Sequence, residues 1–301
     1  MARSRNGPRT GNPRARRRLA PYLFVLPNMI VFGLFTIWPA ISGFNVSLYD
    51  SDNGRTFEYV GVDNYRNILT DDDYLAAVQN TLVFVLGFVV VVTLFATLLA
   101  LLLNHQRRGR GPLRAAYFLP VIISPVVVGL VWNWMLTRGT GVVNGVLDRL
   151  GAGQPGWLLE PELAMVAVIG VGVWVNLGFF TMILLAGLQS IDPTLYEAAR
   201  IDGANIWQQS REVTLPLLRP SMLVVVILAT ITGFQAFDYI YTLTGGGPVG
   251  ATTLMVQFIY ERAFQSPIEY GIASAAGVIF FVVVFGVTAL NYLVGRRRGA
   301  I

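Results

Sequence analysis

Long apolar segments alternate with polar loops along most of the chain. Six segments have the roughly 20 apolar residues that an α-helix needs to cross a bilayer. We predict them at Leu19–Leu48, Val78–Leu103, Leu113–Leu136, Leu163–Leu188, Leu217–Tyr241 and Gly271–Val294. The pattern therefore predicts an all-α polytopic membrane protein with six transmembrane helices and a membrane domain over residues 19–295.

The two ends of the chain lack this apolar pattern. Residues 1–18 are rich in arginine, glycine and proline, a composition typical of disordered segments. A nucleic-acid-binding arm is conceivable, but an apolar segment follows at once, which favours a cytoplasmic tail and no nucleic-acid partner. Residues 296–301 form a second, short tail that we also predict to be cytoplasmic.

The distribution of arginine predicts the orientation. With the amino terminus inside, 17 of the 22 arginines fall in cytoplasmic segments. The five on the outer side are Arg55, Arg66, Arg138, Arg149 and Arg262. Because basic residues are retained on the cytoplasmic side, we expect both termini and the loop at 189–216 to lie inside the cell.

Composition excludes several kinds of chemistry. Charged residues make up 13% of the 301-residue chain, about half of the roughly 25% usual in soluble proteins. The chain has no cysteine and no lysine, so it has no thiol nucleophile, no phosphate-loop lysine and no Schiff-base lysine. The single histidine, His105, lies in a basic turn where solvation explains it better than catalysis does. We predict no catalytic residue, no metal site and no cofactor in this chain.

The stretch Leu188–Pro220 differs from the rest because it is polar and punctuated like two short helices. Asp192 is an N-cap followed by proline, which suits the first helical position. Gly203 supplies a helix stop because glycine adopts the left-handed conformation easily. A second short helix is expected to begin near Asn205 and to end before Pro216.

The turn between these two helices presents small side chains and two charges. Small residues let another protein approach closely, although amphipathic helices lying on lipid are a simpler explanation from composition alone. The candidate docking residues are Glu197, Ala198, Ala199, Asp202, Gly203 and Ala204.

The order of residues in this turn changes that assessment. Glu-Ala-Ala-x-x-Asp-Gly-Ala over residues 197–204, followed by Thr-Leu-Pro at 214–216, resembles the EAA loop of ABC importer permeases. In that family the loop docks into a cleft on a cytoplasmic ATPase. The resemblance implies that a partner ATPase dimer binds here and that this partner binds the ATP and Mg²⁺.

A second block carries an independent resemblance. Residues 237–248, Phe-Asp-Tyr-Ile-Tyr-Thr-Leu-Thr-Gly-Gly-Gly-Pro, are similar to a block found in carbohydrate-uptake permeases of the maltose and glycerol-phosphate type. The glycine triplet is no phosphate loop, because it follows no strand and precedes no lysine. The resemblance implies a heterodimer with a second homologous permease, and an extracytoplasmic solute-binding protein.

Polar and aromatic residues within the apolar segments are candidates for the solute pathway. Amides and carboxylates can hydrogen-bond to sugar hydroxyls, while aromatic rings stack on the apolar face of a pyranose. Alternative roles are an aromatic belt at the membrane surface or polar contacts between helices. The candidates are Trp132, Asn133, Asn176, Gln235, Asp238 and Tyr239.

The sequence favours the permease subunit of an ATP-binding-cassette importer in a bacterial cell membrane. It would move a sugar or related solute by alternating access, driven by a separate ATPase docked on residues 189–216. The alternative is a stand-alone channel or secondary transporter, which would show intramembrane charge relays or paired broken helices. An intramembrane enzyme is a third possibility, but one histidine and no cysteine offer little to build its site from.

Overall fold

The computed structural model describes residues 13–51, 54–105 and 110–297 and is almost entirely helical. The first helix is interrupted by a π-helical turn, and a small hairpin and a short helix follow it. These elements are α1 (Pro13–Phe32), η1 (Gly33–Ile37), α2 (Trp38–Val46), β1 (Tyr49–Asp50), β2 (Glu58–Tyr59) and α3 (Asp63–Ile68). Because α1 begins at Pro13, residues 13–18 are helical and our prediction of disorder there is wrong. Proline suits the first helical position, and arginine has a high intrinsic helix propensity. The rest of the two predicted tails, apart from residues 296 and 297 in the last helix, lies outside the described residues.

The bundle itself is built from long helices separated by short ones. Its elements are α4 (Asp72–His105), α5 (Arg110–Ile122), α6 (Pro125–Leu136), α7 (Val142–Arg149), α8 (Pro161–Gln189), α9 (Pro193–Ile201), α10 (Ile206–Gln209), η2 (Ser210–Thr214), α11 (Leu215–Phe234), α12 (Asp238–Leu243), α13 (Met255–Phe264) and α14 (Tyr270–Arg297). Among the described residues, five helices are long and apolar enough to cross a membrane, or six if the bent pair α5–α6 is one span. The predicted all-α polytopic architecture is therefore confirmed, and this count is consistent with the predicted six spans.

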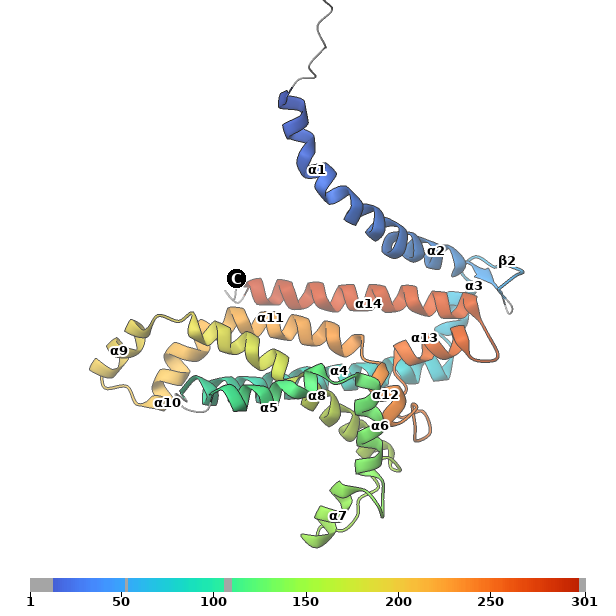
Figure 1. Cartoon of the computed structure of the whole chain (residues 1–301). Helices are drawn as coiled ribbons and strands as arrows, with labels where there is room; N and C mark the ends of the chain where they lie inside the picture. Colours follow the sequence, from blue (N-terminus) through green and yellow to red (C-terminus); the bar gives the residue numbers. More distant parts are fainter. Residues whose placement is uncertain (1–12, 52–53, 106–109, 298–301) are drawn as a thin grey trace, which may run out of the picture.

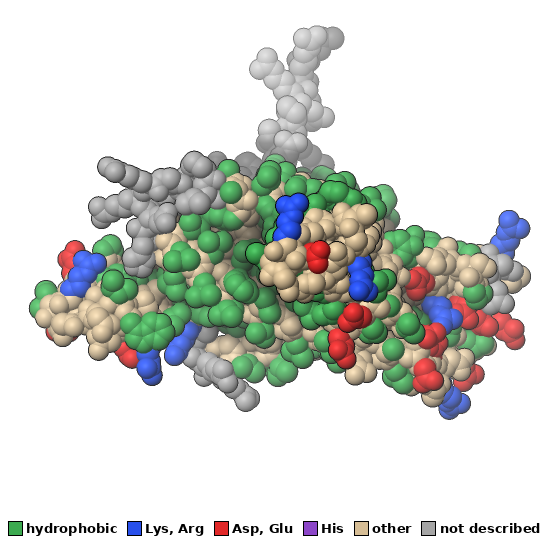
Figure 2. Space-filling view, turned by 90° about the horizontal axis from the view of Figure 1, so that it is seen from below, with side chains coloured by type: hydrophobic (Ala, Val, Ile, Leu, Met, Phe, Trp, Pro, Cys, Tyr) green, Lys and Arg blue, Asp and Glu red, His purple; other side chains and the backbone are tan. Residues whose placement is uncertain are grey.

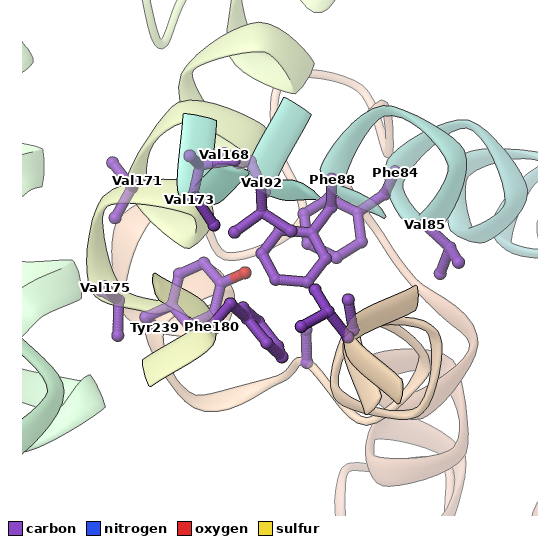
Figure 3. Packing of buried hydrophobic residues seen from close by; sticks show 14 of the residues in the cluster. Phe84, Val85, Phe88, Val92, Val168, Val171, Val173, Val175, Phe180 and Tyr239 are labelled. Carbon is purple, nitrogen blue, oxygen red and sulfur yellow. The ribbon is translucent and has the colours of Figure 1, made fainter. Parts of the chain in front are cut away.

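The core lies between α4, α8 and α11. Phe88 of α4 stacks on Phe84 with ring centroids 5.8 Å apart and meets Phe180 of α8 edge-on at 6.4 Å. Figure 3 shows these rings gathered with Tyr239 and a set of valines from both helices. Close approach depends on small residues, since a Cβ at Gly178 would lie 2.3 Å from the Tyr117 carbonyl oxygen of α5.

The outer surface of the bundle has the distribution of a membrane protein. Charged side chains gather at the two ends of the molecule and over the projecting α7 region, with apolar side chains between these groups (Figure 2). The first helix stands away from the bundle (Figure 1), and large apolar side chains such as Phe24 and Phe35 are 89% and 77% exposed along it. Only a nonpolar environment, lipid or another protein, suits such a surface.

Two of the predicted spans are not single helices. The segment Leu113–Leu136 runs straight through Pro120 and breaks at Ser124, where α5 and α6 meet at 107°. Ser124 precedes Pro125 and takes ψ 128°, because a following proline disfavours helical geometry. The segment at 217–241 ends its helix at Phe234 and resumes at α12, so the prediction of one continuous helix is also wrong there.

The prediction that the second short helix ends before Pro216 is wrong as well. The chain stays helical from Ile206 to Phe234, with the π-helical turn η2 just before the proline. A π turn shifts the hydrogen-bond register by one residue, so it accommodates a proline ring that would clash in a regular helix. The docking loop therefore leads without a break into a membrane-spanning helix.

Candidate docking element and solute cavity

The two helices of the docking element are fixed by local caps. The Asp192 side chain accepts a 2.9 Å hydrogen bond from the Thr194 backbone N–H, and this bond holds the pKa of Asp192 below its usual range. At the other end of α9, Gly203 has φ +81° and its N–H donates to the Arg200 carbonyl, while Ala204 N–H donates to Ala199. This is a Schellman cap, which requires a residue such as glycine with positive φ.

The second helix of the element has a reciprocal cap. Asn205 accepts from the Gln208 N–H at 2.9 Å, and the Gln208 side chain accepts from the Asn205 N–H at 2.8 Å. Both short helices are therefore delimited by hydrogen bonds between residues within the element.

The structure places all six predicted docking residues at the protruding end of the bundle (Figure 1), three of them on the second half of α9 and three in the turn that follows it. Four of them, at 197, 198, 202 and 203, are exposed, whereas those at 199 and 204 are half-buried. Their contact with a partner stays a prediction, but their accessibility fits it.

Sequence reasoning missed the most prominent apolar residues of this element. Ile201, Ile206 and Trp207 are 86%, 71% and 74% exposed beside the predicted residues. Clustered exposed apolar side chains at the end of a bundle are typical of a surface that contacts another protein or lipid. A tryptophan in an otherwise polar run was the sequence signal that could have revealed it. We call Ile201, Ile206 and Trp207 the apolar tip.

A side-chain contact ties α9 to the base of α11. The Tyr196 hydroxyl lies 3.1 Å from the Thr214 hydroxyl, and Thr214 also donates to the Gln209 carbonyl within the π turn. A cleft of about 320 Å³ lies beside this contact, lined by Glu197 and Arg200 among others. Because Thr214 ends the π turn and immediately precedes α11, the tyrosine–threonine contact links α9 to the start of that helix.

The second site is a cavity of about 250 Å³ where the two broken spans meet. It is lined by Pro125, which follows the first break, and by residues 235–238, which form the second. Asn176 of α8 and Thr232 of α11 complete its polar wall. Irregular backbone at membrane depth is tolerated where it lines a cavity, and transporters use such breaks to bind solutes.

The structure sorts the six predicted pathway residues into two groups. Four of them line this cavity: Asn176, Gln235, Asp238 and Tyr239. Trp132 instead packs edge-on against Trp174 with centroids 5.5 Å apart, and Asn133 donates to the Leu243 carbonyl at 2.7 Å. These last two contacts join α6 to its neighbours, so they support the structural alternative for Trp132 and Asn133.

The two outer segments α6 and α12 cross closely beside the cavity. A Cβ at Gly129 would lie 1.9 Å from the Thr242 hydroxyl and 2.5 Å from the Tyr239 carbonyl oxygen. Thr242 also donates to the Val126 carbonyl at 3.2 Å.

Paired broken helices are the feature that we expect of a secondary transporter. This chain contains such a pair, so the feature alone does not separate a secondary transporter from an ABC importer permease. Among the described residues, no group of acidic, histidine or cysteine side chains could hold a metal ion.

Comparisons with known proteins show which protein families this chain resembles. Residues 92–299 match the family described as "Binding-protein-dependent transport system inner membrane component". The chain is 37% identical to a trehalose/maltose transport system permease protein of Thermococcus litoralis, over 92% of this chain and 94% of that protein. It is 34% identical to a sulfoquinovosyl glycerol transport system permease protein of Agrobacterium fabrum, over 93% and 92% of the two chains.

A solved structure shares the fold. A chain of a bacterial alginate ABC transporter, crystallised with an alginate pentasaccharide-bound periplasmic protein, superposes with a TM-score of 0.83. The two chains are 28% identical, and the superposition covers 94% of this chain and 96% of the other.

Proposed function

Because the chain belongs to the family of binding-protein-dependent transport system inner membrane components, we propose that it is the permease subunit of an ABC importer for a carbohydrate. The printed names of its relatives, among them trehalose/maltose and alginate systems, support this class of solute. A cavity with amide, hydroxyl and aromatic groups has the chemistry that binds sugars.

The exposed apolar tip is the observation that best supports a separate ATPase as the source of energy for transport. Three large apolar side chains are exposed on a rigidly capped element that continues into α11. A partner that moves this element also moves a membrane-spanning helix, whose far end at Phe234 leads into the cavity wall. The partner ATPase would bind ATP and Mg²⁺, and the cavity would switch between outward and inward access.

A second permease subunit completes the pathway in this proposal. The cavity is not fully enclosed. The first helix stands away from the bundle (Figure 1), and the apolar side chains of its described part are exposed. The co-crystal of the alginate transporter supports a solute-binding protein as a further partner on the outer side. The arginine bias supports the orientation, with both termini and the docking element in the cytoplasm of a cell whose inner membrane holds the chain.

The docking role is tested by variants that change one turn only. Gly203→Pro removes both the left-handed residue and the N–H that caps α9, so we expect loss of ATPase copurification and of carbohydrate uptake at an unchanged protein level. Glu197→Lys reverses an exposed charge in the same turn and should act in the same direction.

The chain offers a matched control for this experiment. Gly151 caps α7 in the same way, with φ +78° and with hydrogen bonds from Gly151 to Asp148 and from Ala152 to Leu147. Gly151→Pro should therefore leave the ATPase bound. Normal ATPase binding by both docking variants would contradict the proposal, and solute flux through the purified chain without any ATPase would favour a channel or secondary transporter.

A further inference from the structure

Four aromatic side chains form an unbroken run of ring contacts between α12 and α13. Phe237 immediately precedes α12, and Tyr241 lies one turn further along that helix. Tyr260 and Phe264 lie one turn apart on α13. The centroid of the Tyr260 ring is 5.1 Å from that of Phe237, 5.5 Å from that of Tyr241 and 5.4 Å from that of Phe264. We call these four residues the aromatic track.

The aromatic track connects the cavity at the helix breaks with the protein surface. At one end Phe237 lines that cavity. At the other end Phe264, the last residue of α13, is 70% exposed. The two rings between them are half-buried. Because neighbouring rings touch along the whole run, a solute that leaves one ring meets the next before it loses contact with the protein.

The opposite face of α13 is fastened to the bundle and holds the track in place. Phe258 is buried and meets Tyr74 of α4 edge-on with ring centroids 5.3 Å apart. Arg262 lies over the Phe258 ring and pairs with Asp71 at 3.2 Å. Two positions along an α-helix correspond to a rotation of about 200°, so the two track residues of α13 project from the other side.

Polar groups border the rings of the track. The Gln265 side chain donates a 3.1 Å hydrogen bond to the Tyr241 hydroxyl. At the cavity end Gln235 is exposed and lines the same cavity as Phe237. A pyranose ring has apolar C–H faces and a rim of hydroxyls, so aromatic faces bordered by amides and hydroxyls match both parts of it. Neutral and acidic sugars share these C–H faces.

We propose that the aromatic track is a carbohydrate-binding path that guides pyranose rings from the outer surface to the cavity, with Phe264 as the first ring that the sugar meets. This inference rests on the proposed carbohydrate transport. It describes the wall of the entry route that this chain supplies, and the second permease would supply the facing wall. Trehalose, maltose and alginate, which the names of the similar proteins contain, are all built of pyranose rings.

The test centres on Phe264 because Phe237 and Tyr241 belong to the block at 237–248 that glycerol-phosphate-type permeases share, whereas Phe264 lies beyond it. Gln265→Cys supplies a single thiol beside Tyr241 in this cysteine-free chain. The permease pair is assembled with its ATPase, with ATP bound and hydrolysis blocked by chelation of Mg²⁺. The probes are maltose, trehalose and an alginate trisaccharide.

We expect at least one of these sugars at saturation to slow modification of the thiol by a methanethiosulfonate reagent about threefold or more. Adding Phe264→Leu should raise the sugar concentration for half-maximal protection about 3- to 10-fold, because it removes the stacking face and keeps an apolar side chain. Phe264→Trp keeps an aromatic face and should keep the protection. The melting temperature should stay unchanged in both variants, since the side chain is exposed.

The chain offers two controls. Leu150→Cys, at a position 76% exposed near the end of α7, supplies a thiol that sugar should not protect. Phe281→Leu removes an aromatic ring that is 67% exposed on α14, outside the track, and should leave the protection of the thiol at position 265 unaltered. Absence of protection by all three sugars, equal protection at position 150, or unchanged protection in Phe264→Leu would each overturn the inference.

Uptake measurements test the consequence for transport. At saturating loaded binding protein, we expect Phe264→Leu to lower carbohydrate uptake about 3- to 10-fold and Phe264→Trp to retain it. Wild-type uptake by Phe264→Leu would overturn the inference and assign the ring to an aromatic belt at the membrane surface. If the unsubstituted transporter takes up no carbohydrate, the proposed function fails, whereas the thiol protection still decides whether the aromatic track binds pyranose rings.

Discussion

The docking element and the outer crossing of α6 with α12 both interrupt long helices, yet they are held in opposite ways. The docking element is fixed by caps between residues close in sequence, and it leaves Trp207 and two isoleucines exposed. The outer crossing depends on contacts between distant segments, such as Asn133 with the Leu243 carbonyl. The difference fits the proposal that a partner covers the docking element, whereas α6 and α12 hold one another in place by contacts within this chain.

The largest expected effect concerns the outer crossing. Gly129→Ala would place a methyl group within 2.5 Å of the Tyr239 backbone oxygen, which cannot move without shifting α12. Overpacking of this kind costs about 1–3 kcal/mol or more, so we expect a lower melting temperature and less folded protein.

Gly145→Ala is its control, because nothing lies within 4 Å of a Cβ there. That substitution should be neutral or stabilising by up to about 1 kcal/mol, as expected for removing a helical glycine. Equal melting temperatures for the two variants would show that α6 and α12 are not in close contact.

The apolar tip should give a large effect on binding and none on folding. Trp207→Ala removes an exposed anchor, so we expect the affinity for the partner ATPase to fall by about 10- to 100-fold with an unchanged melting temperature. Leu150→Ala, at a position 76% exposed near the end of α7, should leave that affinity unaltered. Titration of the purified permease pair with the ATPase measures both.

Loss of the side-chain contact between α9 and the start of α11 should reduce the coupling of ATP hydrolysis to transport more than it reduces binding of the ATPase. Tyr196→Phe removes the hydroxyl that contacts Thr214, so we expect the ATPase still to bind but fewer solute molecules to enter per ATP hydrolysed. Thr214→Val should have the same effect, and the double variant should be no worse than either single one.

A tyrosine at the other end of the bundle provides the comparison. Tyr65→Phe removes a 2.6 Å contact with the Ser47 hydroxyl and should leave the coupling ratio unchanged. If the Tyr196 and Thr214 variants all transport the wild-type number of solute molecules per ATP hydrolysed, this contact does not transmit motion from the ATPase to α11.

The smallest expected effect is on thermal stability, and it distinguishes a partly buried ion-pair network from an exposed ion pair. Arg262 is 26% exposed and contacts Asp71 and Glu269, which tie α13 to the start of α4 and to the loop before α14. Arg262→Gln should lower the melting temperature by a few degrees, as expected for a partly buried network worth about 1–2 kcal/mol. Arg211→Gln, in a pair that is more than 70% exposed on both sides, should not change it.

The sequence predicted the parts of the fold that depend on local or periodic signals. The six apolar spans, the Asp192 cap and the left-handed Gly203 follow from residue type and spacing, and the structure has all of them. The break at Ser124 had a local signal too, because the proline that follows it disfavours helical geometry at the preceding residue.

The features that sequence reasoning missed depend on three-dimensional contacts. Nothing local to Asn133 shows that its partner is the Leu243 carbonyl, 110 positions later, and so it could not be separated from the residues that line the cavity. The π turn before Pro216 also has no simple sequence signal, because either a stop or a register shift satisfies the proline.

The central claim is that residues 197–204 bind a nucleotide-hydrolysing partner on the cytoplasmic side. It is tested most directly by placing one thiol at Ala198, which is exposed, in this cysteine-free chain. We predict that a membrane-impermeant maleimide labels this thiol in inside-out vesicles, does not label it in right-side-out cells, and is blocked when the ATPase is bound. Labelling from outside the cell, or labelling that the bound ATPase does not reduce, would contradict the account.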